Sequence, residues 1–266
     1  MSTDSPVPAF PASPASVQRI RFVLVGTQHP GNIGAAARAL KTMGLARLVL
    51  VAPEQYPADE AFRRAAGADD LLASATVVQD LAEAIADCRF VLGCTARSRR
   101  VALQEMTPRL AGERIMQVAA RDEVAVVFGR ERTGLSNEEL QLCHASVHIP
   151  ANPEYSSLNL AAAVQVLAYE VRIAALSAVE DSPRAATIDA NNETVATHAQ
   201  LEGFFGQLGE TLDDIDFHKG RAPESAMRKL RRLFLRSNLN EQEVRLLRGI
   251  LADAQRMARL ARQKDD

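Results

Sequence analysis

Short apolar runs alternate with helix-forming segments through the first two thirds of this chain. The strand-like runs are rich in Val, Ile, Leu and Phe and occupy residues 20–25, 48–52, 76–78, 90–94, 124–128 and 147–149. Helix-forming segments occupy residues 35–43, 81–86, 111–120 and 137–142, and a polar stretch covers 61–72. Strands that alternate with helices are typical of a mostly parallel sheet covered on both faces. The sequence therefore predicts an α/β fold for this region.

The segment 157–176 differs from the other predicted helices because it is apolar around nearly its whole circumference. A surface helix has a single apolar stripe, so we expect this one to be buried in its own core or in a subunit interface. The chain has no run of about 18 uncharged apolar residues, which predicts no membrane-spanning segment.

The C-terminal part has a different composition. Residues 177–198 contain few large apolar residues and are predicted to form a linker, and residues 199–266 are predicted to form a small all-α module. Its helices are expected over 201–212, from Pro223, and from Asn240, with Glu243 placed for a capping box. Residues 219–266 hold 13 basic and 6 acidic residues, a net of +7, whereas the rest of the chain holds 18 and 27, a net of -9. This charge separation indicates a basic module that binds a polyanion.

The remaining composition points to a protein of the cytoplasm. Residues 1–17 are rich in Pro, Ser and Ala without a basic start or an apolar core, so we expect a disordered leader and no signal peptide. The domain assigned to the sheet then covers 18–176. Cys88, Cys94 and Cys143 lack the spacing of disulfide or zinc sites. The histidines show no metal-ligand spacing either, so no metal site is predicted.

The turn after the first strand is ambiguous by itself. Residues 25–34 lie where a dinucleotide-binding loop would lie, but they lack G-x-G-x-x-G, and Pro30 removes a backbone N–H that would hold phosphate. Its glycines are equally explained by tight packing. Arg38 follows in a helix of small and apolar residues, where it is either a solvated charge or an anion binder.

Three more segments combine a strand end with small or polar residues. Gly129 ends a strand, where a ligand can approach the backbone, although Glu131 and its flanking arginines also suit a solvated salt-bridge cluster. Ser156 and Ser157 are expected to cap the apolar helix, either as an ordinary cap or as an anion-binding helix start. The small residues at 94–96 precede Arg97, Arg99 and Arg100, a solvated patch or a phosphate site.

Three of these segments, taken in order, resemble one protein superfamily. They read Asn32-Ile-Gly-Ala-Ala-Ala-Arg38, Phe128-Gly-Arg-Glu-Arg-Thr-Gly-Leu135 and Ile149-Pro-Ala-Asn-Pro-Glu-Tyr-Ser-Ser-Leu-Asn-Leu160. This set resembles the SPOUT superfamily of knotted RNA methyltransferases. The last segment and the C-terminal extension are similar to the bacterial TrmJ type, the tRNA 2′-O-methyltransferases that act on cytidine or uridine 32.

The resemblance implies a deep trefoil knot in the sheet domain, which neither periodicity nor spacing shows. It implies S-adenosylmethionine as the methyl donor and a homodimer formed through the knot domain. The cofactor-binding residues implied by the family motifs are Cys94, Thr95, Ala96, Gly129, Glu131, Ile149, Ser156, Ser157, Leu158 and Asn159. Cys94 stands where Thr or Ser is common in relatives, so its backbone is the expected contact.

The implied reaction is methylation of a pyrimidine 2′-hydroxyl at position 32 in the tRNA anticodon loop, with no metal. The family places Arg38 at this hydroxyl, reaching the cofactor of the other subunit, with Ser157 and Tyr155 nearby. RNA contacts are expected at Asn32, Arg97, Arg99, Arg228, Arg231 and Arg232. The alternatives are methylation of another tRNA or rRNA position and a non-catalytic RNA-binding relative. An oxidoreductase of the Rossmann type is disfavoured by the missing glycine pattern.

Overall fold

A computed structural model describes residues 15–96, 103–180, 194–219 and 222–265. The predicted leader lies almost wholly outside these residues, as do Arg97, Arg99 and Arg100. The described strands are β1 (Ile20–Val25), β2 (Arg47–Val51), β3 (Thr76–Val78), β4 (Phe90–Cys94), β5 (Gln104–Met106), β6 (Val124–Phe128) and β7 (Ala145–Val147). The helices of the sheet domain are α1 (Pro30–Thr42), α2 (Asp59–Ala65), α3 (Asp69–Ala73), α4 (Leu81–Ile85), α5 (Pro108–Ala119), α6 (Asn137–Gln141) and α7 (Leu160–Glu180).

The strands form one sheet in the order β3-β2-β1-β6-β4-β7-β5, and every neighbouring pair is parallel. In its centre, Phe22 lies opposite Leu48 on one side and Val126 on the other. The predicted α/β fold with a parallel sheet is therefore confirmed. The trefoil knot stays a prediction.

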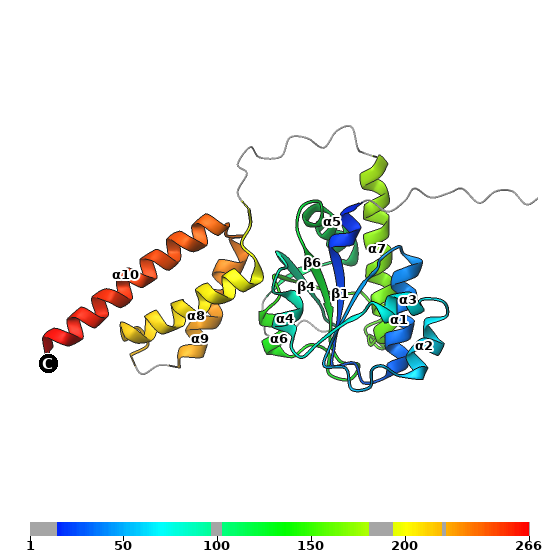
Figure 1. The fold of residues 1–266 in the computed structure, drawn as a ribbon, viewed down its shortest axis with the longest axis horizontal. Helices are drawn as coiled ribbons and strands as arrows, with labels where there is room; N and C mark the ends of the chain where they lie inside the picture. Colours follow the sequence, from blue (N-terminus) through cyan, green and yellow to red (C-terminus); the bar gives the residue numbers. More distant parts are fainter. Residues whose placement is uncertain (1–14, 97–102, 181–193, 220–221, 266) are drawn as a thin grey trace, which may run out of the picture.

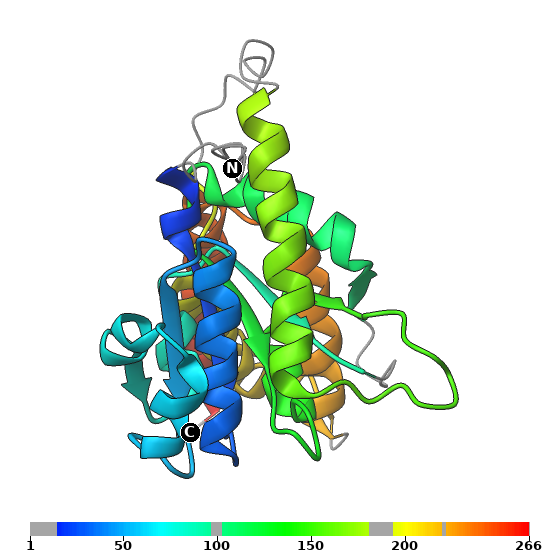
Figure 2. The same ribbon diagram turned by 90° about the vertical axis from the view of Figure 1, so that its right-hand side faces the viewer.

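Helices cover both faces of the sheet (Figures 1 and 2). One face packs against α1, α5 and α7 and receives Phe22 and Val126 from the central strands. The other face packs against α4 and α6 and receives Val23 and Val127. Alternate residues of a central strand thus enter different cores, which explains why these strands are apolar without interruption.

Helix α7 packs beside α1 and α5, as the green helix in Figure 2 shows. Val164, Leu167 and Val171 are buried in the core, whereas Tyr169 on another face is 48% exposed. The span Leu160–Ala178 is long and apolar enough to cross a membrane, but core helices pass the same test and 39% of it is buried. The all-round apolar sequence therefore reflects a buried face plus a second face that none of the described residues covers.

The C-terminal residues form α8 (His198–Asp214), α9 (Pro223–Arg236) and α10 (Glu241–Asp265) around a separate apolar core that includes Phe204, Phe205 and Leu235. The predicted start signals are confirmed. Pro223 is the first residue of α9. At the start of α10, Asn240 and Glu243 exchange two hydrogen bonds of 2.8 Å, which is a capping box.

Several local predictions were wrong. No element was assigned to the polar stretch 61–72, which contains most of α2 and all but the last residue of α3. Strand β5 was missed because Gln104 and Glu105 are exposed at the sheet edge and give no apolar signal. The last strand ends at Val147 instead of beginning there. Helix α7 extends to Glu180, into the segment predicted as a linker.

Candidate active site

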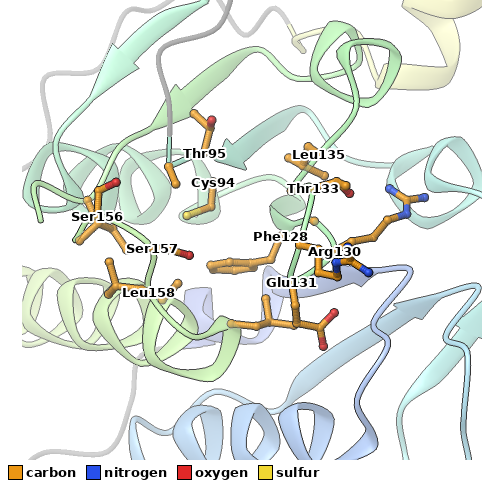
Figure 3. Close-up of a pocket in the computed structure, with 17 residues that line it drawn as sticks. Cys94, Thr95, Phe128, Arg130, Glu131, Thr133, Leu135, Ser156, Ser157 and Leu158 are labelled. Carbon is orange, nitrogen blue, oxygen red and sulfur yellow. The ribbon is translucent and has the colours of Figure 1, made fainter. Parts of the chain in front are cut away.

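The carboxyl ends of β4, β6 and β7 lie side by side, and a cavity of about 460 Å³ opens beside them (Figure 3). Open α/β sheets bind ligands at this end of the strands. Each strand continues into a loop that lines the cavity. The lining residues are Cys94, Thr95, Ala96, Phe128, Gly129, Arg130, Glu131, Arg132, Thr133, Gly134, Leu135, Ile149, Ser156, Ser157, Leu158, Leu160 and Ala163.

Backbone and ring contacts join the loop after β4 to the end of β7. The Thr95 N–H donates to the Val147 carbonyl over 3.0 Å, and the His148 ring contacts the Thr95 carbonyl through Nδ1 at 3.2 Å. Burial raises the pKa of the Cys94 thiol to about 12, so this side chain stays neutral and is a poor nucleophile. These contacts hold the residues that end β4 against those that follow β7.

The loop after β6 folds back on itself at Gly129. A side chain there would place its Cβ 2.1 Å from the Gly134 carbonyl carbon, so only glycine fits. The Gly134 N–H donates to the Arg130 carbonyl over 2.8 Å and closes the turn. The close approach of the Gly134 backbone to Gly129 therefore requires a glycine at position 129, whether or not a ligand is bound.

Glu131 joins this loop to the start of α1. Its carboxylate accepts hydrogen bonds from the Gln28 N–H at 3.0 Å, the His29 N–H at 3.2 Å and the Asn32 amide at 2.9 Å. Burial alone would raise the pKa of the Glu131 carboxyl, but these hydrogen bonds outweigh it and lower the pKa. In Figure 3 the carboxylate points away from Cys94 and Phe128. Glu131 lines the cavity, but its charge is used to position α1.

Asn159 extends this connection to α7. Its Nδ2 donates to Asn32 Oδ1 over 2.9 Å, while its Oδ1 accepts from the Ala161 N–H over 2.9 Å. Asn159 is therefore the cap of α7, and the prediction that Ser156 and Ser157 cap it was wrong. Asn159 also does not line the cavity. The residues Asn32, Glu131 and Asn159 bring the three sequence segments together through side-chain hydrogen bonds.

The three predicted catalytic residues lie in different positions. Ser157 lines the cavity, and in Figure 3 its hydroxyl points toward the Phe128 ring. Arg38 and Tyr155 do not line it. Tyr155 is 82% exposed, and Arg38 is an exposed residue of α1 whose guanidinium has no partner among the described residues. A single chain therefore does not bring Arg38 to the cavity.

The predicted RNA-binding residues also separate. Arg228 and Arg232 are exposed on α9. Arg231 is not available in the same way, because it bonds the Gln141 carbonyl at 3.2 Å, pairs with Glu202 and lies 4.5 Å over the Phe205 ring. Asn32 likewise has both ends of its amide occupied. Arg231 and Asn32 therefore position neighbouring elements of the fold through these contacts. An RNA contact by either residue stays a prediction.

Phe128 and Leu135 begin and end the second sequence segment and had no predicted role, yet both line the cavity. Their position inside a glycine-bounded segment was the available signal. Leu160 and Ala163 were not identified as cavity residues, because only the packing of α7 brings its first turn there.

Comparison with known proteins agrees with this geometry. Residues 19–169 match the model of the SpoU rRNA Methylase family, and residues 199–264 match the C-terminal domain of the tRNA methyltransferase TrmJ. The chain belongs to the SpoU methylase family, in its TrmJ branch. The first match spans the sheet domain with all three cavity loops, and the second spans the helical module.

Individual relatives cover nearly the whole chain. The tRNA (cytidine/uridine/adenosine-2′-O-)-methyltransferase TrmJ of Pseudomonas aeruginosa is 48% identical over 247 residues, 91% of this chain and 96% of the relative. The tRNA (cytidine/uridine-2′-O-)-methyltransferase TrmJ of Salmonella typhimurium is 49% identical over 89% of this chain and 96% of its own length. The crystal structure of TrmJ from Z. mobilis ZM4 matches with a TM-score of 0.75 at 36% identity, over 88% of this chain and 97% of that protein's chain.

Proposed function

We propose that this protein transfers a methyl group from S-adenosylmethionine to the 2′-hydroxyl of a pyrimidine ribose at position 32 in the tRNA anticodon loop. One observation supports this proposal above the others. The three loops that follow β4, β6 and β7 converge on a single cavity, in a chain whose relatives named above are tRNA 2′-O-methyltransferases.

The cavity suits S-adenosylmethionine in size and chemistry. Its volume of about 460 Å³ lies within the usual range of roughly 300–1,000 Å³ for small-ligand sites. Backbone groups of the three loops would hold the adenine and the amino-acid end, Phe128 and Leu158 offer apolar surface, and the hydroxyls of Thr95 and Ser157 offer hydrogen bonds. When bound, this cofactor supplies an electrophilic methyl group with a good leaving group, so no metal is needed.

Arg38 is proposed to act in the cavity of a second subunit. It is exposed on α1, and α1 packs beside α7, which has an exposed apolar face that includes Tyr169. A homodimer formed through this side of the sheet domain would cover that face. It would also bring Arg38 of one subunit to the cofactor cavity of the other.

The side chains then have separable tasks. A guanidinium is always protonated under these conditions and does not act as a base. Arg38 therefore stabilises the developing alkoxide and the neighbouring phosphate, while the hydroxyl proton passes to phosphate or water. Ser157 and Tyr155 orient the ribose. Most of the acceleration comes from positioning and from this charge stabilisation.

The substrate is held mainly by the basic helical module, because the rest of the chain has net negative charge. The relatives' names share 2′-O-methylation of a tRNA nucleoside, which is cytidine or uridine and, for the Pseudomonas protein, also adenosine. Methylation of a 2′-hydroxyl restricts the target to RNA. Free cysteines and a tRNA substrate agree with a cytoplasmic protein.

The direct test is transfer of a labelled methyl group from S-adenosylmethionine to unmodified tRNA transcripts, followed by mass-spectrometric mapping. The expected product is one 2′-O-methylated ribose at position 32. Labelling at another position would support the alternative tRNA or rRNA substrate. Cofactor binding without labelling of any RNA would contradict the enzymatic function.

A further inference from the structure

The helical module of α8, α9 and α10 lies beside α4 and α6 of the sheet domain (Figure 1). Among the described residues, its apolar side chains form a core that is separate from the two cores of the sheet domain. Domains without a large shared apolar interface move relative to each other unless specific contacts hold them. Three such contacts are present, and we call them the polar junction: the start of α8, the Arg89–Glu241 ion pair and the Arg231–Gln141 hydrogen bond.

The start of α8 is capped by the sheet domain. A helix leaves its first N–H groups without an acceptor inside the helix. The His198 N–H donates to the Cys88 carbonyl over 3.0 Å. The Ala199 N–H donates to the Ala86 carbonyl over the same distance, and both carbonyls lie just after α4. The amide protons of His198 and Ala199 therefore report whether the module is docked.

Arg89, the residue before β4, connects the sheet domain to the module. Its guanidinium forms an ion pair with Glu241, the first residue of α10, at 3.2 Å, and a second one with Asp122 of the sheet domain at 2.9 Å. The side chains of Arg89 and Glu241 are 15% and 27% exposed, so salt screens this pair less than a fully exposed pair. Loss of either partner therefore weakens the hold of the module on the sheet domain.

Arg231 of α9 makes the third connection. Its Nε donates to the carbonyl of Gln141, the last residue of α6, over 3.2 Å. Within the module it pairs with Glu202, and its guanidinium carbon lies 4.5 Å from the centre of the Phe205 ring. The Arg231 side chain is only 16% exposed. These contacts hold its guanidinium in the orientation that reaches α6.

Helix α6 connects the polar junction to the cofactor cavity. It begins shortly after the loop 129–135, which lines the cavity. Arg130 of this loop forms an ion pair with Glu139 of α6 at 2.9 Å. Gln141, which accepts the hydrogen bond from Arg231, belongs to the same short helix. A substrate held by the docked module is therefore held at a defined position relative to the cavity of the same chain.

We propose that Arg89, Arg231 and Glu241 are positioning residues, which hold the helical module against the sheet domain so that the bound tRNA presents its target ribose at the cofactor cavity. Binding of tRNA by the module does not itself require the polar junction, whereas attack on the methyl group requires the ribose oxygen to be closely placed. The proposal rests on the proposed function, because it takes the reacting group to be a tRNA ribose.

Glu241→Gln in the full-length protein is the sharpest test, because it opens the Arg89–Glu241 pair without removing a cation. Loss of a negative charge does not weaken attraction to a polyanion, so tRNA affinity should stay within about twofold of wild type or increase. The kcat at saturating tRNA should fall about tenfold, because a misplaced ribose attacks more slowly. Affinity for S-adenosylmethionine should be unchanged, since Glu241 does not line the cavity.

Further variants separate docking from other effects. Arg89→Ala should also lower kcat, and the double variant with Glu241→Gln should be no worse than Arg89→Ala alone, because both residues act through one pair. Arg89→Lys keeps the charge and should recover most of the kcat. Arg231→Ala breaks the contact with α6 and should lower kcat as well. The matched control is Glu210→Gln, which removes an exposed glutamate from the second half of α8 and should leave kcat within about twofold of wild type.

Hydrogen exchange measures docking without any dependence on catalysis. In wild type, the His198 and Ala199 amides should be protected by their bonds to the sheet domain. In Glu241→Gln their exchange should be about tenfold faster, because the junction opens more often. The amides of Phe204 and Leu208, which lie in the core of the module, should keep their protection and so verify that the module is folded.

The positioning role is overturned if Glu241→Gln and Glu210→Gln have the same kcat, or if a lower kcat comes with unchanged exchange at His198 and Ala199. A loss of tRNA affinity as large as the loss of kcat would also overturn it, because the junction would then act in binding. If wild type methylates position 32 and the variants match it, only the positioning role fails. If wild type transfers no methyl group to tRNA, the proposed function fails and the positioning role fails with it.

Discussion

At the scale of single residues, charge and hydroxyl placement decide the chemistry. Arg38→Ala is expected to reduce turnover on tRNA by about 100-fold or more, because it removes the group that stabilises the developing alkoxide. Affinity for S-adenosylmethionine should stay within about twofold of wild type. Lys41→Ala is the control, since it removes another exposed charge from α1 that is already paired with Asp70. Turnover within threefold of wild type would remove Arg38 from the mechanism.

Ser157→Ala now separates a site role from a stability role, because the structure assigns the cap of α7 to Asn159. The substitution should leave the free energy of unfolding within about 0.5 kcal/mol of wild type, as is usual at exposed positions. It should still reduce turnover or cofactor affinity. Thermal unfolding and turnover are measured on the same preparation, and a loss of stability of about 1 kcal/mol or more would restore the capping explanation.

At the scale of elements, the exposed side of α7 carries the expected subunit contact. Tyr169→Asp places a charge on this face, where Tyr169 is 48% exposed in the single chain. Sedimentation should show a monomer, and turnover should be lost because Arg38 no longer reaches a second cavity. Val77→Asp is the control at an equally exposed position on β3, at the edge of the sheet. A Tyr169→Asp protein that remains a fully active dimer would contradict this interface.

The first residues of some helices were predictable from the sequence, and those of others were not. Pro223 and the Asn240–Glu243 pair are local signals, and α9 and α10 begin there. The start of α7 offered several competing caps within a few residues. Asn159 is the cap because its other amide end bonds Asn32, which is 127 residues away in the sequence.

At the scale of the whole molecule, the junction between the two parts is expected to lose stability in acid. Burial, followed by the charges of His198, Arg114 and Arg231, lowers the pKa of His144 to about 3, and burial also lowers the pKa of His198. Below about pH 6.5 the unfolded chain binds protons that the folded chain does not. Stability should therefore fall by about 1.4 kcal/mol per pH unit for His144 as pH decreases from about 6.5 toward 3.

The check is a pair of denaturation series between pH 7 and pH 5. His144→Asn keeps an acceptor for the Val91 N–H, which bonds His144 Nδ1 at 3.1 Å in the wild type. Between pH 7 and pH 5, the free energy of unfolding should fall less for the variant than for the wild type, by up to about 2 kcal/mol. Parallel pH profiles for the two proteins would show that His144 is charged in the folded state.

A shortened chain that ends at Glu180, the last residue of α7, tests the separation of the two parts. It retains both cores of the sheet domain and the cofactor cavity, so it should fold, dimerise and bind S-adenosylmethionine. It should lose most tRNA affinity and show a shallower salt slope, since the basic module is absent. Unchanged methylation by the shortened chain would mean that the catalytic dimer alone holds the substrate.

The sequence alone determined the features that depend on local chemistry and order. Alternating apolar runs indicated the parallel sheet, and nine of the ten residues that the family resemblance assigned to cofactor binding line the cavity, all but Asn159. Both results follow because the motif residues stand directly after strands, and parallel strands bring their carboxyl ends to one edge. The charge separation between the two parts also follows directly from the positions of the charged residues in the sequence.

Tertiary packing selects which polar groups are used in holding the fold. Glu131, Asn159 and Arg231 are all polar residues in promising segments, yet their side chains bond residues from distant parts of the chain. Such partners are set by packing, which local spacing does not encode.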